Sequence, residues 1–145
     1  MYQMYRTVEF KKEHLEVMDL RQHERKLLET GQFGEYLERG VACTGLVDGR
    51  IVCCGGVNLL PGNTADIWLI PSIHVKRHTK VFVKGLREWL FTVANDLGVN
   101  RMQTICVNDD LHNRWMKFLG FKKEAIMEKF YNEDDYVMYA RTQWD

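Results

Sequence analysis

The chain has 145 residues, of which 46% are hydrophobic and 28% charged, and its 20 basic and 20 acidic side chains give a net charge of 0. This length and composition are typical of a globular protein, so we expect residues 1–145 to form a single domain. A dedicated nucleic-acid-binding protein usually carries a basic excess, and the balanced charge argues against that class.

The cysteines and the apolar runs indicate an intracellular protein. The chain has four cysteines and no Cys-x-x-Cys pair, which favours buried free thiols in a reducing compartment over a metal site. These cysteines are Cys43, Cys53, Cys54 and Cys106. No apolar run approaches the roughly 18 residues of a membrane-spanning helix, and the first residues lack the apolar stretch of a signal peptide.

The first half of the chain changes from a helical to an alternating apolar pattern after Gly40. The pair Asp48-Gly49 predicts a tight hairpin turn between two alternating runs. In the run after this turn, Gly55 and Gly56 predict a bulge or a close backbone approach. The expected elements are a strand over Tyr2–Phe10, a helical segment over Lys11–Thr30 broken near Asp19–Gln22, a helical turn over Phe33–Glu38, and strands over Val41–Val47, Arg50–Leu59 and Thr64–Ile70.

The second half contains a long amphipathic segment that ends at Gly98. Its apolar residues recur at helical spacing and are Phe82, Leu86, Trp89, Leu90, Val93 and Leu97. The elements expected after this helix are a strand over Arg101–Val107, a short helix over Asn108–Leu119 ending at Gly120, and a hairpin of two strands, Phe121–Phe130 and Asp135–Arg141. The order β-α-α-β-β-β-α-β-α-β-β predicts an α/β fold with a mixed sheet flanked by helices, in which the long helix connects two neighbouring parallel strands.

A cluster of basic residues separates the strand Thr64–Ile70 from the long helix. The cluster consists of His74, Lys76, Arg77, His78 and Lys80. A helix start offers unpaired N–H groups and the positive end of the helix dipole, so this strand, turn and helix form a candidate anion site. The alternative is a solvated basic turn on a helix whose apolar stripe belongs to the core.

Two stretches then identify a resemblance over essentially the whole chain. Both stretches resemble the GNAT superfamily of acyl-CoA-dependent N-acyltransferases. The first is the hairpin Leu46-Val47-Asp48-Gly49-Arg50-Ile51-Val52. The second is Asn113-Arg114-Trp115-Met116-Lys117-Phe118-Leu119-Gly120-Phe121, which follows a strand with Asn108 at its tip. The hairpin is similar to the one before that family's cofactor strand. The later segment is similar to the family's fourth helix, which ends in Leu-Gly-Phe.

Within the superfamily the chain resembles the GNAT-like proteins of short-tailed bacteriophages. This likeness rests on Arg21-Gln22-His23-Glu24-Arg25, the Leu-Val-Asp-Gly hairpin and Asn113-Arg114-Trp115-Met116-Lys117. One branch of that group consists of internal virion proteins. The resemblance implies a location in the host cytoplasm or the virion, with other virion or assembly proteins or a second copy as partners. Trp144 lies at the end of the chain with little core left to join, so it is a candidate contact to a partner. No nucleic-acid or membrane role is expected.

The cofactor turn of a GNAT enzyme has the pattern Arg/Gln-x-x-Gly-x-Gly/Ala, whose small residues let the backbone approach the phosphates. This chain reads Arg77-His78-Thr79-Lys80-Val81-Phe82, so Arg77 fits while Lys80 and Phe82 replace both small residues. Their side chains are expected where a phosphate packs, although Phe82 also belongs to the apolar stripe. If acetyl-CoA or CoA binds, the resemblance implies contacts from Leu69, Ile70, Arg77, His78, Thr79, Lys80, Phe82, Asn108 and Met116.

The catalytic groups of the family are not obvious in this chain. Met116 stands where the family often has a tyrosine that protonates the departing thiolate. Asp66 is a candidate base, with a capping or solvated carboxylate as the alternative. Tyr131, Tyr136 and Tyr139 of the last hairpin are candidate acids, Tyr131 first among them, with half-buried strand aromatics as the alternative. His74 and His78 could share a metal ion but have no third ligand in view, which favours two solvated imidazoles.

Two functions therefore stay open. In one, the protein is a phage virion or assembly component with a degenerate acetyl-CoA site and no activity. In the other, it is an active N-acetyltransferase that moves an acetyl group from acetyl-CoA to an amine of a small molecule or protein.

Overall fold

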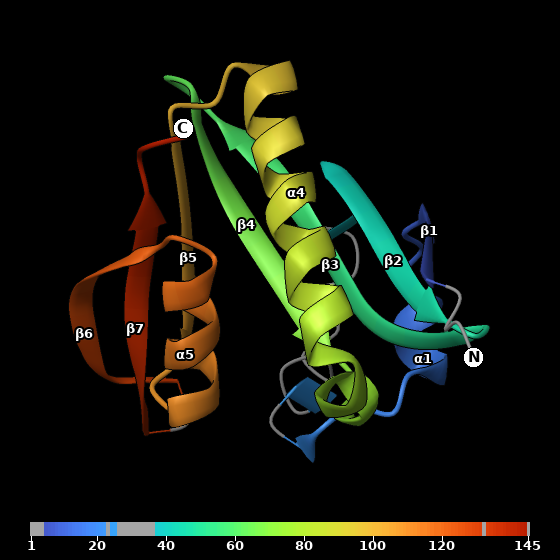
Figure 1. Ribbon diagram of the computed structural model, residues 1–145. Helices are drawn as coiled ribbons and strands as arrows, with labels where there is room; N and C mark the ends of the chain where they lie inside the picture. The colour runs from blue at the N-terminus through green and yellow to red at the C-terminus, as the bar shows by residue number, and fades with distance from the viewer. Residues whose placement is uncertain (1–4, 23, 26–36, 132, 145) are drawn as a thin grey trace. The chain divides into compact units, whose positions relative to one another are not determined.

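The computed structural model describes residues 5–22, 24–25, 37–131 and 133–144 (Figure 1). The strands are β1 (Tyr5–Glu9), β2 (Val41–Val47), β3 (Arg50–Leu60), β4 (Thr64–Pro71), β5 (Arg101–Val107), β6 (Lys122–Tyr131) and β7 (Asp134–Arg141). The helices are α1 (His14–Val17), the 3-10 helix η1 (Ile73–His78), α4 (Thr79–Leu97) and α5 (Asp110–Phe118). One mixed sheet holds the 7 strands in the order β1-β2-β3-β4-β5-β7-β6, which confirms the predicted α/β class.

The chain divides into two compact units, each with its own buried residues. The first comprises residues 1–58 and 67–81, and the second comprises residues 59–66 and 82–145. That the chain acts as one domain stays a prediction. None of the described helices is both long and apolar enough to cross a membrane.

In the first unit, β1, β2 and β3 pair as an antiparallel meander. Its core cluster consists of Phe10, Leu15, Met18, Leu37, Cys54 and Ile70. The predicted close approach occurs at Gly56, where an added Cβ would lie 2.5 Å from the indole nitrogen of Trp68. The predicted bulge lies elsewhere, because the register shifts between Gly45 and Leu46 while Gly55 and Gly56 pair regularly.

The helical segment expected over Lys11–Thr30 is shorter in its described part. Turn residues precede α1, which begins at His14, and the chain is not helical from Met18 to Arg21, so the predicted break is confirmed. Leu15 and Met18 are buried, and a β-type backbone at Met18 ends the helix. Helical residues resume after the break at Gln22, Glu24 and Arg25, and residues 23 and 26–30 lie outside the described residues. Of the helical turn predicted over Phe33–Glu38, only Leu37 and Glu38 are described, and both are helical.

In the second unit, β5 pairs in parallel with the start of β4, with Thr64 opposite Arg101. This parallel pair confirms the crossover predicted for the long helix. β7 pairs antiparallel with both β5 and β6, which completes the predicted C-terminal hairpin. Trp144 donates a hydrogen bond to the Asn100 carbonyl, and the guanidinium of Arg141 lies 4.3 Å above its ring, so this indole packs on its own chain.

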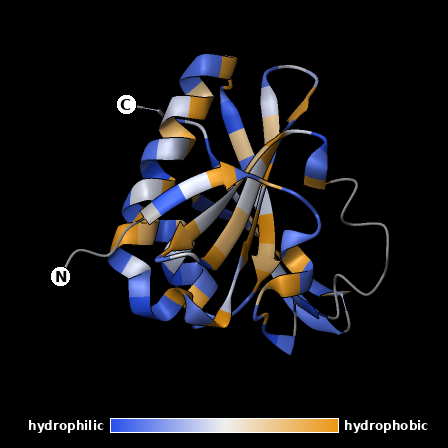
Figure 2. Cartoon of the chain, turned by 90° about the vertical axis from the view of Figure 1, so that its right-hand side faces the viewer, coloured by the Kyte–Doolittle hydropathy of each residue, from blue (hydrophilic) through white to orange (hydrophobic). Residues whose placement is uncertain are grey.

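The long helix α4 is amphipathic, as its alternating orange and blue bands in Figure 2 show. It begins at Thr79, before the first residue of the predicted stripe. The buried residues of the helix are Phe82, Val83, Leu90, Val93 and Ala94. Leu97 is 38% exposed, so its predicted place in the stripe is wrong. At the last turn the chain leaves the helix through Gly98, whose φ of +66° favours glycine, and Val99 becomes the buried residue instead.

Candidate functional site

A 3-10 helix follows directly after β4 and carries the basic cluster predicted from the sequence. Ser72 is buried and caps this helix, because its hydroxyl accepts a hydrogen bond of 3.0 Å from the His74 N–H group. The Ser72 N–H group in turn donates to the Val52 carbonyl at 2.9 Å, which ties the start of η1 to β3. The N-terminal segment is also attached, since Asp19 accepts from the His74 ring at 2.6 Å. The basic helix is therefore anchored at its start.

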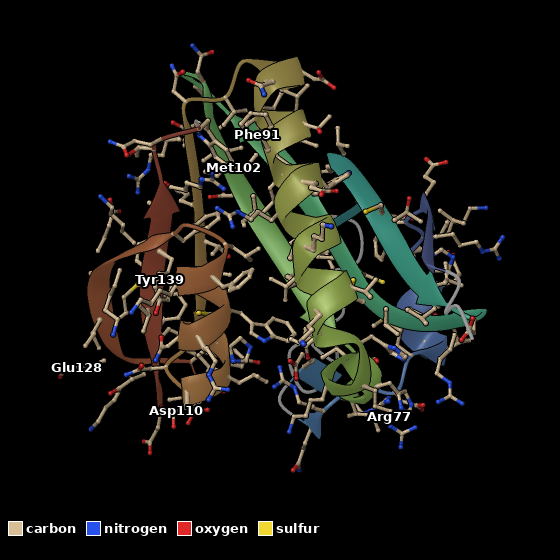
Figure 3. All side chains as sticks on the ribbon, viewed as in Figure 1. Arg77, Phe91, Met102, Asp110, Glu128 and Tyr139 are labelled. Carbon is tan, nitrogen blue, oxygen red and sulfur yellow. The ribbon has the colours of Figure 1, made fainter. Side chains whose placement is uncertain are left out.

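The end of η1 and the start of α4 form a hollow of about 340 Å³ lined by residues 76–81. Lys76, Arg77 and Lys80 all have exposed side chains, and Arg77 projects outward in Figure 3. Within the described part of the chain, no acidic side chain pairs with these three cations. Three exposed cations around one hollow, with no acidic partner among the described residues, have the charge that suits a multiply charged anion.

The backbone of this turn is more helical than a glycine-rich cofactor loop. Thr79 has φ −56° and ψ −45°, so η1 and α4 follow one another without a break. The Thr79 hydroxyl donates to the Lys76 carbonyl at 3.1 Å, which occupies that side chain within the helix. The donors that this turn exposes are therefore mainly the cationic side chains of Lys76, Arg77 and Lys80.

Phe82 does not line the hollow, although it occupies the second position where the cofactor pattern has a small residue. Its side chain is 1% exposed and its ring lies 5.6 Å from the Trp115 ring, centroid to centroid. The lining of the hollow ends at Val81. Phe82 is thus a core residue of the second unit. Of the two residues that replace a small residue of the cofactor pattern, only Lys80 lines the hollow.

The other residues predicted on β4 have structural partners. Ile70 belongs to the core of the first unit, and Leu69 approaches Gly55, whose added Cβ would lie 3.3 Å from it. Asp66 accepts a hydrogen bond of 2.9 Å from the side chain of Gln103, the residue opposite it on β5. This contact makes Asp66 a link between two parallel strands, and its role as a base stays a prediction. Tyr131 is half-buried at the end of β6, opposite Asp134, and its role as an acid stays a prediction too.

A second group of polar residues gathers where β5 ends and α5 begins. Asn108 is exposed at the strand tip, and its N–H group donates to the Asp135 carbonyl at 2.9 Å. Its side-chain oxygen accepts 2.9 Å from the amide of Asn113 on α5, which in turn accepts from the hydroxyl of Tyr139 on β7. The sequence indicates Asn108, but not that Asn113 and Tyr139 complete a chain of hydrogen bonds with it.

Met116 and Cys106 lie near this group in the fold but offer little chemistry. Met116 is 6% exposed, so it packs in the core at the position where a tyrosine would be expected to act. Burial raises the pKa of the Cys106 thiol to about 12, and the neighbouring Asp109 carboxylate contributes to this rise. A thiol that stays protonated at neutral pH is a poor nucleophile. Cys106 is only partly buried, so the core position predicted for it is wrong.

A metal site finds no support in the part of the chain that the structure describes. No group of three or more His, Cys, Asp or Glu side chains there could hold a metal ion. His74 pairs with Asp19 instead of sharing a ligand position with His78. All four cysteines are free thiols, and Cys53 and Cys54 are buried as predicted. Cys43 and Cys106 are only partly buried, so the predicted burial is wrong for these two.

Comparison with known proteins identifies the architecture. No family model and no curated protein matches the sequence. Among solved structures, an acetyltransferase of the GNAT family from Bacillus anthracis is 12% identical, with a TM-score of 0.69 and 95% of this chain and 94% of that chain covered. The chain has the GNAT fold.

Two further acetyltransferase structures match nearly the whole chain. The IAA acetyltransferase of Bacillus cereus is 14% identical, with a TM-score of 0.72 over 97% of this chain and 100% of that one. An acetyltransferase of Bacillus subtilis in complex with CoA is 20% identical, with a TM-score of 0.70 over 98% of this chain and 99% of that one. These likenesses concern the fold, and the chemistry must be argued from the residues of this chain.

Proposed function

We propose that this protein is an acyl-CoA-dependent N-acyltransferase that holds the phosphates of its cofactor at the basic hollow of residues 76–81. The observation that carries the proposal is a set of three exposed cations between β4 and α4, none of which pairs with an acidic side chain of the residues that the structure describes. A solved structure of the same fold is a complex with CoA, which supports this cofactor class.

The residues of the hollow fit a phosphate-bearing cofactor by their donor chemistry. Arg77 can bind a phosphate through two parallel hydrogen bonds, while Lys76 and Lys80 supply point charges. Lys80 replaces the close backbone approach of the glycine-containing pattern with a flexible cation. Binding that depends on side-chain charge rather than backbone donors should weaken strongly as the salt concentration rises.

When bound, an acyl-CoA supplies a thioester carbonyl that an amine can attack. The chain's task is to orient that carbonyl, to keep the acceptor amine neutral and to provide a proton donor for the departing sulfur. Asp66 and Tyr131 are the proposed base and acid, carried over from the sequence pattern. The acceptor is proposed to be an amine of a small molecule or of a protein.

A second candidate is favoured by the buried side chain at Met116. In this candidate the protein is a bacteriophage GNAT-fold component of the virion or of its assembly, present in the host cytoplasm and the particle, with a vestigial site. Its partners would be other virion or assembly proteins or a second copy of the chain. A methionine in the core cannot donate a proton to a thiolate, and Lys80 and Phe82 replace both small residues of the cofactor turn.

One experiment separates the two candidates. Purified protein is incubated with acetyl-CoA and a mixture of primary amines, including peptides with free N-termini. The proposed enzyme releases free CoA thiol faster with amines than without them, and mass spectrometry finds an acetylated amine. Absence of amine-dependent release, together with recovery of the protein in purified phage particles, would favour the second candidate instead.

A further inference from the structure

Asp19 is an acidic residue that the first unit holds beside the basic 3-10 helix η1. The residue before it, Met18, is 3% exposed and belongs to the same core cluster as Ile70 near the end of β4. The Asp19 carbonyl accepts a hydrogen bond of 2.8 Å from the N–H group of Ile73, the first residue of η1. Neither contact uses the Asp19 carboxylate, so the fold keeps this acid beside η1 whichever cation it pairs with.

The Asp19 carboxylate pairs with the ring of His74, which is its one partner among the described residues. The two side chains approach to 2.6 Å, from the carboxylate oxygen to Nε2 of the ring. The ring is fixed from its backbone, since the His74 N–H group donates to the capping hydroxyl of Ser72 at 3.0 Å. The side chain of Asp19 is 64% exposed and that of His74 only 19%, so the acid is accessible to other cations while the imidazole is held in place.

Arg77 follows His74 by three residues in the same 3-10 helix. Such a helix has three residues per turn, so these two side chains lie on one face, about 6 Å apart along the axis. A carboxylate paired with one of them therefore lies within reach of the long side chain of the other. Among the described residues, however, Arg77 pairs with no acid and is exposed at the basic hollow. The acid on this face is used by His74, and the guanidinium one turn later is left for a ligand.

We propose that His74 is a positioning residue, which keeps the Asp19 carboxylate away from Arg77 so that Arg77 can bind a phosphate group of the cofactor. This inference rests on the proposed function for its ligand, and all three residues belong to the first unit. Without the imidazole, the carboxylate would still be held beside η1 by Ile73 and would form an ion pair with Arg77. A phosphate would then have to displace this carboxylate before it could bind the guanidinium.

A double-mutant cycle tests the positioning role by calorimetric titration with CoA. His74→Ala should weaken CoA binding about two- to fivefold, because an exposed ion pair between Asp19 and Arg77 must be broken first. Removing the carboxylate as well, in the double variant His74→Ala with Asp19→Ala, should restore the wild-type Kd. A double variant that binds as weakly as His74→Ala would show that the pair only braces the helix, and would overturn the proposal. Wild-type affinity of His74→Ala would overturn it too.

Two further variants keep the test sharp if His74→Ala lowers stability. His74→Gln places an amide NH₂ group near the position of the imidazole Nε2, so it can still hold the carboxylate and should keep the wild-type Kd. Asp19→Ala removes the competing acid and should leave the Kd unchanged or slightly lower. Weaker binding by Asp19→Ala would mean that the hollow needs this carboxylate for its shape, and the proposal would be wrong. It would also be wrong if His74→Gln bound CoA as weakly as His74→Ala.

Arginine side-chain NMR separates this inference from the proposed function, because it needs no ligand. The Nε–H resonance of Arg77, identified by its loss in Arg77→Ala, should shift in His74→Ala and return to its wild-type position in the double variant. If these shifts occur but the wild type binds no CoA, the proposed function fails while the positioning role of His74 is upheld. If the wild type binds CoA and the Arg77 resonance is the same in His74→Ala, the positioning role fails alone.

Discussion

The ring of Phe82 packs against the indole of Trp115, with centroids 5.6 Å apart and the planes tilted by 46°. The pair joins α4 to α5, and both side chains are buried, at 1% and 6% exposure. An aromatic contact of this kind stabilises beyond the area it buries. The second unit therefore needs a phenylalanine at position 82 for its core.

Phe82→Ala should destabilise the protein by about 3–5 kcal/mol, because it leaves a cavity against Trp115. Urea unfolding followed by circular dichroism measures the change in the free energy of unfolding. Val81→Ala is the matched control, because Val81 is next to Phe82 in the chain but is 45% exposed, so its truncation should change the free energy of unfolding little. Equal stability of the Phe82→Ala variant and the wild type would contradict the core placement.

Gly56→Ala should destabilise the first unit, because the added Cβ would lie 2.5 Å from the Trp68 indole nitrogen. Forcing a methyl group into a packed site costs about 1–3 kcal/mol. The neighbouring Gly55→Ala is the control, as its Cβ would meet the flexible end of Leu69 at 3.3 Å. Thermal unfolding should give Gly56→Ala a Tm well below that of Gly55→Ala. The reverse order of Tm would show that the Trp68 indole does not occupy this position.

The buried thiol of Cys54 should make the protein less stable in alkaline solution. Burial raises its pKa to about 12, so the folded state holds this proton more tightly than the unfolded chain does. The stabilisation is complete below about pH 8 and is lost as the pH rises from about 8.5 toward 12. One such group amounts to roughly 2 kcal/mol between pH 7 and pH 10.

Comparison with Cys54→Ala isolates this contribution from other groups that titrate in the same range. The free energy of unfolding of the wild type should fall more steeply between pH 7 and pH 10 than that of the variant. Parallel pH profiles of the two proteins would mean that the Cys54 thiol is not desolvated in the folded state.

Most of the fold is predictable because its elements have strong local patterns. The alternating runs that flank Asp48-Gly49 and the helical spacing from Phe82 to Val93 both depend on residues close together in the sequence. The start of the long helix differs from the prediction because η1 precedes α4 without a break, so the basic residues continue the helix instead of forming a separate turn. The pattern places Leu97 wrongly, because the helical spacing of apolar residues continues into the last turn of α4 but the side chain there is exposed.

The candidate site is only partly predictable, since its contacts join distant residues. The basic hollow is local and is visible in the sequence as the cluster around Arg77. The chain of hydrogen bonds from Tyr139 through Asn113 to Asn108 joins β7, α5 and the tip of β5, and no local pattern marks it. The side-chain direction of Phe82 likewise depends on Trp115, which is remote in sequence.

Titration of CoA into the wild type, Arg77→Ala and Arg87→Ala tests the central claim, that the hollow of residues 76–81 binds the cofactor phosphates. Arg87, on α4, is exposed like Arg77 but lies outside that hollow, so its variant controls for net charge. The account predicts a micromolar Kd for the wild type and for Arg87→Ala, and a Kd about 10–100-fold weaker for Arg77→Ala, as expected for lost charge-assisted hydrogen bonds. No wild-type binding at millimolar CoA, or equal losses in the two variants, would contradict it.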